Sequence, residues 1–293
     1  MITYKCENCG GQMEFGGSGG FVCPYCGSKA FFTDRDFRES EEFRKKLLQY
    51  YKAEADKKDF DYRTDFLWTP SAQDRFTLEN GQSLYIDYMK KYLMDGAACY
   101  IAKESVVYIF DSAKGSADFM AGVKRLRFPA ADTRLHRSFP ELKMELSLRA
   151  GKQALAFRRR PLVYPAEIFA PWEPQHLAWV ISRMENICCT LEYAGIEHRG
   201  ITPDSVWVNP VSHEGMLFGD WRKVRTLLYP QRSADLSALR RTAVRLAKNT
   251  REPAELYAFL TTAPDSDAFT DFKRWDKVIE AGFGGHKFVK MDL

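Results

Sequence analysis

Apolar and polar residues alternate with a helical period in four segments of this chain. The clearest segment runs from Leu177 to Ala194, where apolar residues three and four apart follow one face. Similar spacing predicts helices over residues 235–248 and 267–281. Within residues 33–58, Phe43, Leu47 and Tyr51 recur every four residues among dense charges. This last pattern is typical of an exposed amphipathic helix, which would serve as a connector.

Strand-like segments come earlier in the chain than most of these helices. Residues 97–102 and 106–111 are rich in β-branched and aromatic side chains, which favour strands. A basic stretch from Lys124 to Arg160 follows, and we expect it to be rich in loops. The sequence therefore predicts an α+β chain, with strands in the first half of its main domain and helices in the second.

Composition narrows the class of protein. The chain has 293 residues, of which 45% are hydrophobic and 14% aromatic, enough for a substantial core. Its formal charge of +4 is too small to argue for nucleic acid or membrane binding. No apolar run approaches the roughly 18 residues of a membrane span, and the first residues do not resemble a signal peptide. We therefore expect a cytoplasmic protein without membrane association, in which Cys99, Cys188 and Cys189 are buried, reduced thiols.

Two Cys-x-x-Cys-Gly units near the N-terminus predict a metal site. Cys6 and Cys9 form the first unit, Cys23 and Cys26 the second, and thirteen residues separate the units. Zinc in structural sites prefers four soft ligands in a tetrahedron, and each short turn places two sulfurs on one ion. The spacing predicts a zinc ribbon whose fold depends on the metal. An iron–sulfur cluster, which has the same donors, is the weaker alternative.

Residues 191–221 resemble the catalytic segment of eukaryotic-type protein kinases. The sequence Gly-Ile-Glu-His-Arg begins at Gly195, Pro203 follows, and Val206-Trp207-Val208 reads as a strand. Asp220 then stands where the family has the magnesium-binding aspartate of Asp-Phe-Gly. The resemblance implies that Asp235 anchors the loop from the next helix. It also implies a bilobal domain with a β-rich N-lobe and a helical C-lobe.

The departures from the kinase pattern fall on the reacting positions. The aspartate that accepts the substrate proton is replaced by Gly200, and the asparagine that holds the second magnesium is replaced by Ser205. Asp-Phe-Gly has become Asp220-Trp221-Arg222, and no glycine-rich loop precedes the strands. Because kinase catalysis depends on positioning and electrostatics, these combined losses predict a pseudokinase. His198 is expected to be a core histidine of this degenerate loop.

The strand lysine that binds nucleotide phosphates has one candidate in this sequence. Lys124 follows Ala-Gly-Val, and Glu141 is its possible helix partner. Together with Asp220, these residues would bind ATP and magnesium if the cleft still holds a nucleotide. The carboxylates of Glu197 and Asp204, which flank the loop, could then replace the missing base.

We divide the chain into a zinc ribbon (1–32), a charged helical connector (33–60) and a divergent kinase-like domain (61–293). The favoured function is a binding or scaffold protein with a protein partner and without phosphoryl-transfer activity. One alternative is an active atypical Ser/Thr protein kinase that uses Lys124, Glu141 and Asp220. A second is a nucleic-acid adaptor that uses the ribbon and the basic stretch, although the ribbon contains only Lys5 and Lys29 as bases.

Overall fold

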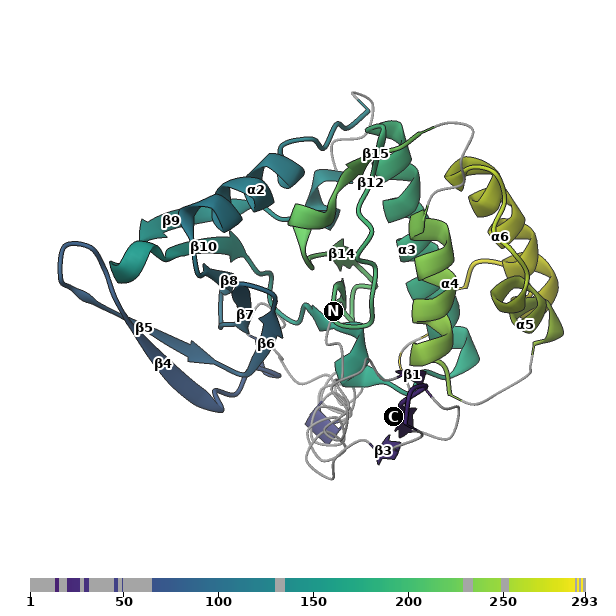
Figure 1. Ribbon diagram of the computed structural model, residues 1–293. Coiled ribbons are helices and arrows are strands. Elements are labelled where there is room, and N and C mark those ends of the chain that lie inside the picture. The colour runs from purple at the N-terminus through teal and green to yellow at the C-terminus, as the bar shows by residue number, and fades with distance from the viewer. Residues whose placement is uncertain are drawn as a thin grey trace.

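The computed structural model describes residues 14–15, 20–26, 29–31, 45–46, 49, 65–129, 135–228, 234–248, 253–287, 289 and 291. In its larger part, a β-rich lobe is followed by a helical lobe (Figure 1). This order confirms the predicted division into strands first and helices later.

A small antiparallel sheet lies at the N-terminal end of the chain. It consists of β1 (Glu14–Phe15), β2 (Gly20–Val22) and β3 (Lys29–Phe31), in that order. Of the expected connector, Lys45, Lys46 and Gln49 are described, and all three are helical. The Lys46 amine donates to the Thr69 hydroxyl at 2.6 Å, so this segment contacts the start of the β-rich lobe.

Five antiparallel strands form the sheet of the β-rich lobe. They are β6 (Lys90–Met94), β7 (Ala97–Ile101), β8 (Ser105–Phe110), β9 (Leu142–Ser147) and β10 (Gln153–Arg158). Their spatial order is β6-β7-β8-β10-β9. The expected strands at 97–102 and 106–111 are β7 and β8, so both predictions are confirmed.

The two faces of this sheet are covered differently. Helix α2 (Ala113–Val123) packs against β8 and β10 on the face toward the helical lobe, and the Ser112 side chain caps its first turn. A hairpin of β4 (Ala72–Thr77) and β5 (Ser83–Tyr88) packs on the opposite, outer face. There, Ile86 of the hairpin joins a second apolar cluster with Tyr100, Val107 and Ile109 of the sheet.

The expectation of a loop-rich stretch from Lys124 to Arg160 is wrong. Strands β9 and β10 occupy much of it, with the short 3₁₀ turns η1 (Leu135–Ser138) and η2 (Arg149–Gly151) nearby. Strand β9 lies at the edge of the sheet, and five of its six residues are exposed. An exposed edge strand can carry charged side chains, and these conceal the usual pattern of a strand.

The helical lobe is built around one long central helix. It consists of α3 (Pro174–Tyr193), α4 (Ala234–Leu246), α5 (Ala254–Thr261) and α6 (Ala268–Phe283). Because α4 and α6 both pack against α3, most of the α3 surface is buried. The predicted helices correspond to α3, α4 and α6, whereas the short α5 was not expected.

Short strands connect the helices of this lobe. Strands β11 (Tyr164–Pro165), β13 (Val206–Val208) and β14 (Gly215–Leu217) form one small sheet. Strands β12 (Ile196–Glu197) and β15 (Arg225–Thr226) form another. The 3₁₀ turns η3 (Ala166–Phe169) and η4 (Trp221–Lys223) precede α3 and β15 respectively.

A buried ion cluster links three helices of this lobe. The Arg240 guanidinium on α4 donates to Glu185 on α3 at 3.0 Å and to Asp271 on α6 at 2.6 Å. The same group lies over the Phe259 ring, 3.3 Å from its centre. All three charged side chains are almost fully buried, so each depends on the others for compensation.

A second buried pair lies where the β-rich lobe meets the segment that leads to the helical lobe. Arg159 directly follows β10, and its guanidinium contacts the Asp65 carboxylate at 2.6 Å, with both side chains nearly inaccessible. Arg159 also donates to the carbonyls of Ala102, Lys103 and Val163. This one side chain therefore ties the residues before the hairpin, the β7–β8 turn and the segment between the lobes together. None of the helices among the described residues is long and apolar enough to cross a membrane.

Candidate functional site

Residues of α4 hold the loop after α3 through hydrogen bonds. Backbone N–H groups of His198 and Arg199 donate to the two oxygens of the Asp235 carboxylate at 2.6 and 2.7 Å. The Thr242 hydroxyl, also on α4, donates to the Ile201 carbonyl at 3.0 Å. Asp235 is buried, so its oxygens are well placed to compensate these N–H groups. The predicted anchoring role of Asp235 is confirmed.

The loop offers no proton acceptor at the position of Gly200. A Cβ atom built on Gly200 would lie 3.1 Å from Cε1 and 3.2 Å from Nδ1 of the His198 ring. Even a small side chain there would be crowded, and a carboxylate would require the imidazole to move. The replacement of the kinase aspartate by glycine is therefore matched by the packing around it.

The predicted core position of His198 is confirmed. Its ring is inaccessible, and it meets the Trp221 ring edge-on at 4.7 Å between centres. Burial lowers the pKa of His198 to about 3, so the imidazole is neutral near pH 7. Neither ring nitrogen has a hydrogen-bond partner among the described residues. With a pKa this low, His198 is a poor general base.

Ser205, at the position of the metal-binding asparagine, turns its hydroxyl inward. That hydroxyl accepts a hydrogen bond from the Thr202 N–H at 2.8 Å and donates to the Thr202 carbonyl at 3.0 Å. The residue is buried within its own turn. Its oxygen therefore stabilises the loop and does not face the space between the lobes.

Asp220 is held by its own neighbour along the chain. The Arg222 side chain contacts both carboxylate oxygens, at 2.8 and 3.0 Å, and the Arg222 N–H donates to one of them at 3.2 Å. Burial raises the pKa of Asp220, but the hydrogen bonds and charge of Arg222, together with Lys223, outweigh it and lower that pKa. A magnesium ion would have to displace this bidentate contact.

These residues do not fit a magnesium site. Both Asp220 oxygens are engaged, the Ser205 hydroxyl points away, and the position of Gly200 has no carboxylate. Among the described residues, no three His, Cys, Asp or Glu side chains are grouped as metal ligands. Of the two flanking carboxylates, Glu197 pairs with Arg199 at 3.5 Å. Asp204 lies close enough to Tyr92 and Cys99 to raise the pKa of both groups, in addition to the larger effect of burial.

Aromatic side chains pack between the sheet and α2, next to the Asp220 segment. Tyr108 on β8 donates from its hydroxyl to the Gly219 carbonyl at 3.0 Å. Its ring packs with Phe110, Phe119 and Phe157, and all four side chains are inaccessible. The sheet and the residue before Asp220 are thus in direct contact.

A second contact links β6 to the segment before α3. The Tyr92 hydroxyl on β6 donates to Glu167 of η3 at 2.7 Å, and Lys90 pairs with the same carboxylate at 3.2 Å. Strands β6 and β7 meet through a tight turn at Asp95-Gly96, where Gly96 has a positive φ of 62°.

The expected arrangement of Lys124 and Glu141 is wrong. Lys124 is the C-cap of α2, and the preceding residues are helical instead of strand-forming. Glu141 lies just before β9, not on a helix, and pairs with Arg158 at 3.3 Å on the surface. The structure does not provide the strand-lysine and helix-glutamate pair for which they were proposed.

Helix α2 approaches the segment after Asp220 unusually closely. A Cβ atom on Gly122 would lie only 2.0 Å from the Trp221 carbonyl oxygen. Trp221 is inaccessible, and its ring also meets Phe139 at 6.0 Å. This contact holds the helix of the β-rich lobe directly against the Asp220 segment, which sequence reasoning did not foresee.

Two of the four predicted zinc ligands lie in the described part of the chain. Cys23 directly follows β2 and is buried, whereas Cys26 ends the turn that leads toward β3 and is exposed. Cys6 and Cys9 lie outside the described residues. The turn that carries Cys23 and Cys26 thus lies between two antiparallel strands, and the zinc site itself stays a prediction.

Comparison with known proteins gives a loose likeness to kinase domains. No family model matches the chain, and no curated protein matches it. The BubR1 kinase domain aligns at 10% identity and a TM-score of 0.49, over 81% of this chain and 92% of that one. The ROP18 kinase domain in complex with AMP-PNP and sucrose aligns at 12% and 0.45, over 83% and 95%. WbdD aligns at 12% and 0.48, over 67% of this chain and 47% of its own, so the chain spans about half of WbdD.

All of these TM-scores are below 0.5. The kinase-like interpretation therefore depends on features of this chain itself. These are the sheet followed by a helical lobe, the loop after α3, its Asp235 anchor, and Asp220 at the end of β14.

Proposed function

We propose that this chain is a zinc-ribbon protein with a kinase-like domain that binds a protein partner and does not transfer phosphate. The observation that carries this proposal is the bidentate contact of Arg222 with the Asp220 carboxylate, which the kinase pattern would leave for magnesium. The Tyr108 hydroxyl supports it, because it links β8 directly to the Gly219 carbonyl beside Asp220. A kinase-like domain whose magnesium-binding aspartate is already paired is suited to binding a protein partner through its surface.

Nucleotide binding is the direct test of this proposal. The full chain is heated with and without ~5 mM MgATP, and the expected change in melting temperature is below about 1 °C, since a ligand that does not bind cannot stabilise the fold. Incubation with labelled ATP is expected to give no autophosphorylation above that of Asp220→Ala. A shift of several degrees or phosphorylation, either of them abolished by Asp220→Ala, would support the atypical-kinase alternative instead.

The zinc ribbon is tested by metal content. We expect about one zinc per purified chain, because four thiolates fill the coordination sphere. Cys6→Ser should release the metal, whereas the matched variant Cys189→Ser, which changes a half-buried cysteine of α3, should retain it. Iron with inorganic sulfide in place of zinc would favour the cluster alternative. A chain without metal at neutral pH would contradict the ribbon.

The nucleic-acid alternative receives little support from the basic stretch. Arg158 and Arg160 pair with Glu141 and Glu214, and Lys152 pairs with Asp111. Arg159 is buried with Asp65. Pairing reduces the positive charge available to phosphates, and phosphate contacts dominate nucleic-acid affinity. We therefore infer that the partner is a protein.

A further inference from the structure

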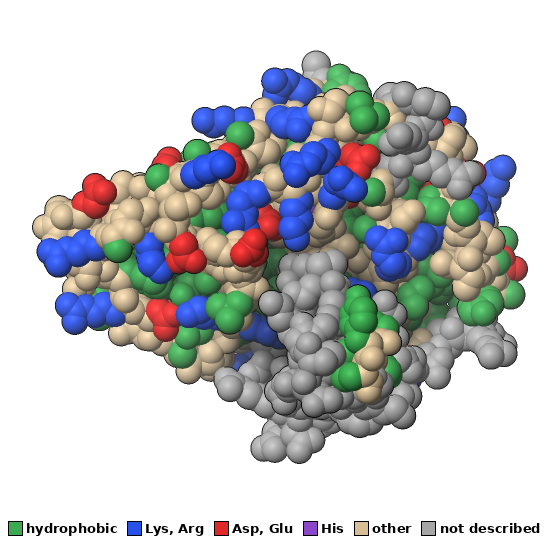
Figure 2. All heavy atoms as spheres, viewed as in Figure 1, with side chains coloured by type: hydrophobic (Ala, Val, Ile, Leu, Met, Phe, Trp, Pro, Cys, Tyr) green, Lys and Arg blue, Asp and Glu red, His purple; other side chains and the backbone are tan. Residues whose placement is uncertain are grey.

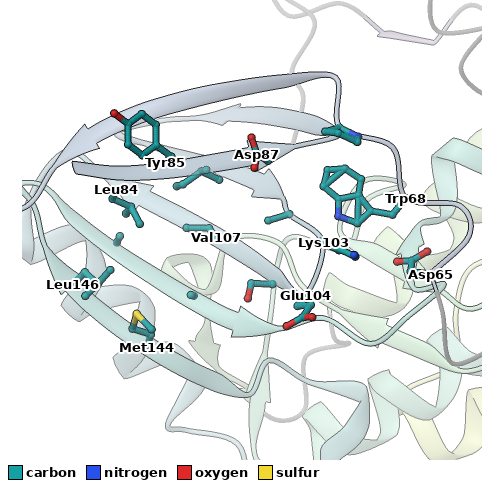
Figure 3. Close-up of a pocket in the computed structure, with 16 residues that line it drawn as sticks. Asp65, Trp68, Leu84, Tyr85, Asp87, Lys103, Glu104, Val107, Met144 and Leu146 are labelled. Carbon is teal, nitrogen blue, oxygen red and sulfur yellow. The ribbon is translucent and has the colours of Figure 1, made fainter. Parts of the chain in front are cut away.

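The hairpin β4–β5 leaves part of the outer face of the main sheet uncovered. A cavity of about 640 Å³ lies beside it, between β5 and the strands β9 and β10 (Figure 3). Its volume is within the usual range for ligand sites. This cavity is on the opposite face of the sheet from α2 and is separate from the Asp220 segment.

The floor of this groove is apolar. Met144 and Leu146 of β9 lie beside Ala154 and Ala156 of β10, and Val107 of β8 continues the surface. The two alanines make the floor deep because their side chains are short. Met144 is 53% exposed, so the apolar floor is open to solvent. Exposed apolar surface next to an unpaired strand edge would be stabilised by a binding partner that covers it.

One wall of the groove is the open edge of a strand. Among the strands that the structure describes, β5 pairs with β4 alone. The Leu78 N–H donates to the Gln82 carbonyl at 2.8 Å, and this bond sets the alternation along the hairpin. Tyr85 and Asp87 therefore direct their N–H and C=O groups away from β4, and both residues line the groove. An added strand would find free hydrogen-bonding groups there.

The end of the groove near Trp68 is polar (Figure 3). The indole nitrogen of Trp68 is buried and has no acceptor among the described residues. The exposed carboxylates of Asp87 and Glu104 lie on this side, together with the Lys103 amine. Asp87 accepts a hydrogen bond from the Gln73 amide at 2.7 Å, and neither carboxylate forms an ion pair within the described part of the chain. This end therefore suits a hydrogen-bond acceptor and a positive charge.

We propose that the groove binds an extended segment of a partner protein as a third strand on β5. The hairpin already lies over the sheet, and stacked sheets pack about 10 Å apart, so a strand added to β5 would lie over β10 and β9. Its alternate side chains would be apolar and face Met144 and Ala156, and a lysine or arginine would face Asp87 and Glu104. This gives the proposed binding function a location, and to that extent depends on it.

The test uses the full chain and a defined peptide. A fluorescein-labelled peptide with two lysines followed by alternating valine and threonine is titrated by fluorescence anisotropy, together with its reversed sequence, since either direction can pair with β5. We expect saturable binding below ~1 mM, in the range of weak peptide recognition. Methylation of alternate backbone nitrogens in the peptide should weaken binding at least tenfold, because it removes the N–H groups that pair with the strand.

Two pairs of variants locate the site. Tyr85→Pro removes an N–H from the open edge of β5 and should weaken binding about tenfold. Arg75→Pro, at the cross-strand partner position, removes one from the far edge of the same hairpin and should not. Met144→Glu places a charge on the floor and should also weaken binding, whereas Lys143→Glu on the same strand should leave it within about twofold.

Several results would overturn this proposal. These are no saturable binding of either peptide, equal binding of the methylated peptide, or equal effects of the two variants in a pair. Equal binding of the methylated peptide would indicate apolar contact without strand addition. The nucleotide test concerns the other face of the sheet, so failure of the peptide would leave the conclusion about Asp220 and nucleotide unchanged.

Discussion

The Tyr108 hydroxyl donates to the Gly219 carbonyl at 3.0 Å and so connects the central strand of the sheet to the residue before Asp220. Both groups lie in the interior, where a carbonyl without a donor is costly. We expect Tyr108→Phe to lower the free energy of unfolding by ~1–3 kcal/mol, measured by urea denaturation. The ring and the Arg222 contact with Asp220 are retained, so MgATP should still not bind. An unchanged stability would mean that the hydroxyl does not connect the lobes.

Gly122 allows α2 to touch the Trp221 backbone, and a methyl group there would overlap the carbonyl oxygen. Gly122→Ala should therefore destabilise the protein by ~1–3 kcal/mol or more, because backbone on both sides cannot yield easily. Gly115→Ala on the same helix is the matched control. Its Cβ would lie 3.3 Å from a Phe110 ring atom, and alanine favours helix, so its effect should stay within ~1 kcal/mol. Similar losses in both variants would argue against the close contact.

The Asp220–Arg222 pair predicts a loss of stability in acid. The pKa of Asp220 is lowered in the folded protein, so the folded state releases this proton more readily than the unfolded chain. Its contribution is therefore present above the unfolded pKa of about 3.9 and disappears as the pH falls through the folded value. Asp220→Asn should be less stable than the wild type at pH 6–7, and the difference should shrink toward about pH 3. Denaturation curves that differ equally at both pH values would contradict this assignment.

The buried cluster around Arg240 predicts the opposite dependence. Burial, reinforced by Asp271, raises the pKa of Glu185 to about 8 despite the opposing effect of Arg240. The folded state then keeps a proton that the unfolded chain loses above about pH 4.3, so stability should fall as the pH rises toward 8. Glu185→Gln carries no such proton, and its stability should decline less over this interval. Parallel profiles for the two proteins would exclude the raised pKa.

Removal of Arg240 should be far more damaging than neutralisation of Glu185. Arg240→Ala leaves the buried Asp271 carboxylate without its cation and Glu185 without its hydrogen-bond donor, and it removes the contact with the Phe259 ring. We expect a loss of ~3–5 kcal/mol in the free energy of unfolding. Arg241→Ala, an exposed neighbour on α4, should change it by less than about 0.5 kcal/mol. If both variants melt alike, the cluster contributes nothing to stability.

Lysine and arginine side chains gather on the face of the molecule that carries α2, β12 and β15 (Figure 2). Two of the arginines in this region form contacts within the chain. Arg222 donates to the Asp220 carboxylate, and Arg125 donates to the Thr226 hydroxyl at 2.7 Å. These contacts are local, and they stabilise the junction between α2 and the segment after Asp220.

Sequence patterns predict those parts of the fold in which apolar residues recur regularly or a distinctive motif occurs. The helical period of α3 and the order of loop, strand and Asp220 predict the helical lobe. The resemblance to kinases also implies the anchoring role of Asp235, which its two hydrogen bonds confirm. Strands β9 and β10 were not foreseen, since an exposed edge strand and a run of arginines resemble a loop. Lys124 was expected on a strand, but it is the C-cap of the helix α2.

The contacts that surround Asp220 could not be derived from the sequence. Tyr108 and Phe110 read as ordinary strand residues, and only the fold shows that one hydroxyl reaches Gly219. The bidentate contact of Arg222 with Asp220 depends on the 3₁₀ turn η4, which no periodicity reveals. Such contacts join residues far apart or in irregular segments, where local patterns carry no information.

The junction of Asp65 with Arg159 makes several contacts depend on one carboxylate. Asp65 also accepts a hydrogen bond from Tyr164 at 2.9 Å, so one carboxylate holds residues on both sides of the segment between the lobes. A change of side chain at Asp65 would therefore release two contacts at once, one on each side of that segment, and leave the Arg159 guanidinium buried without its carboxylate.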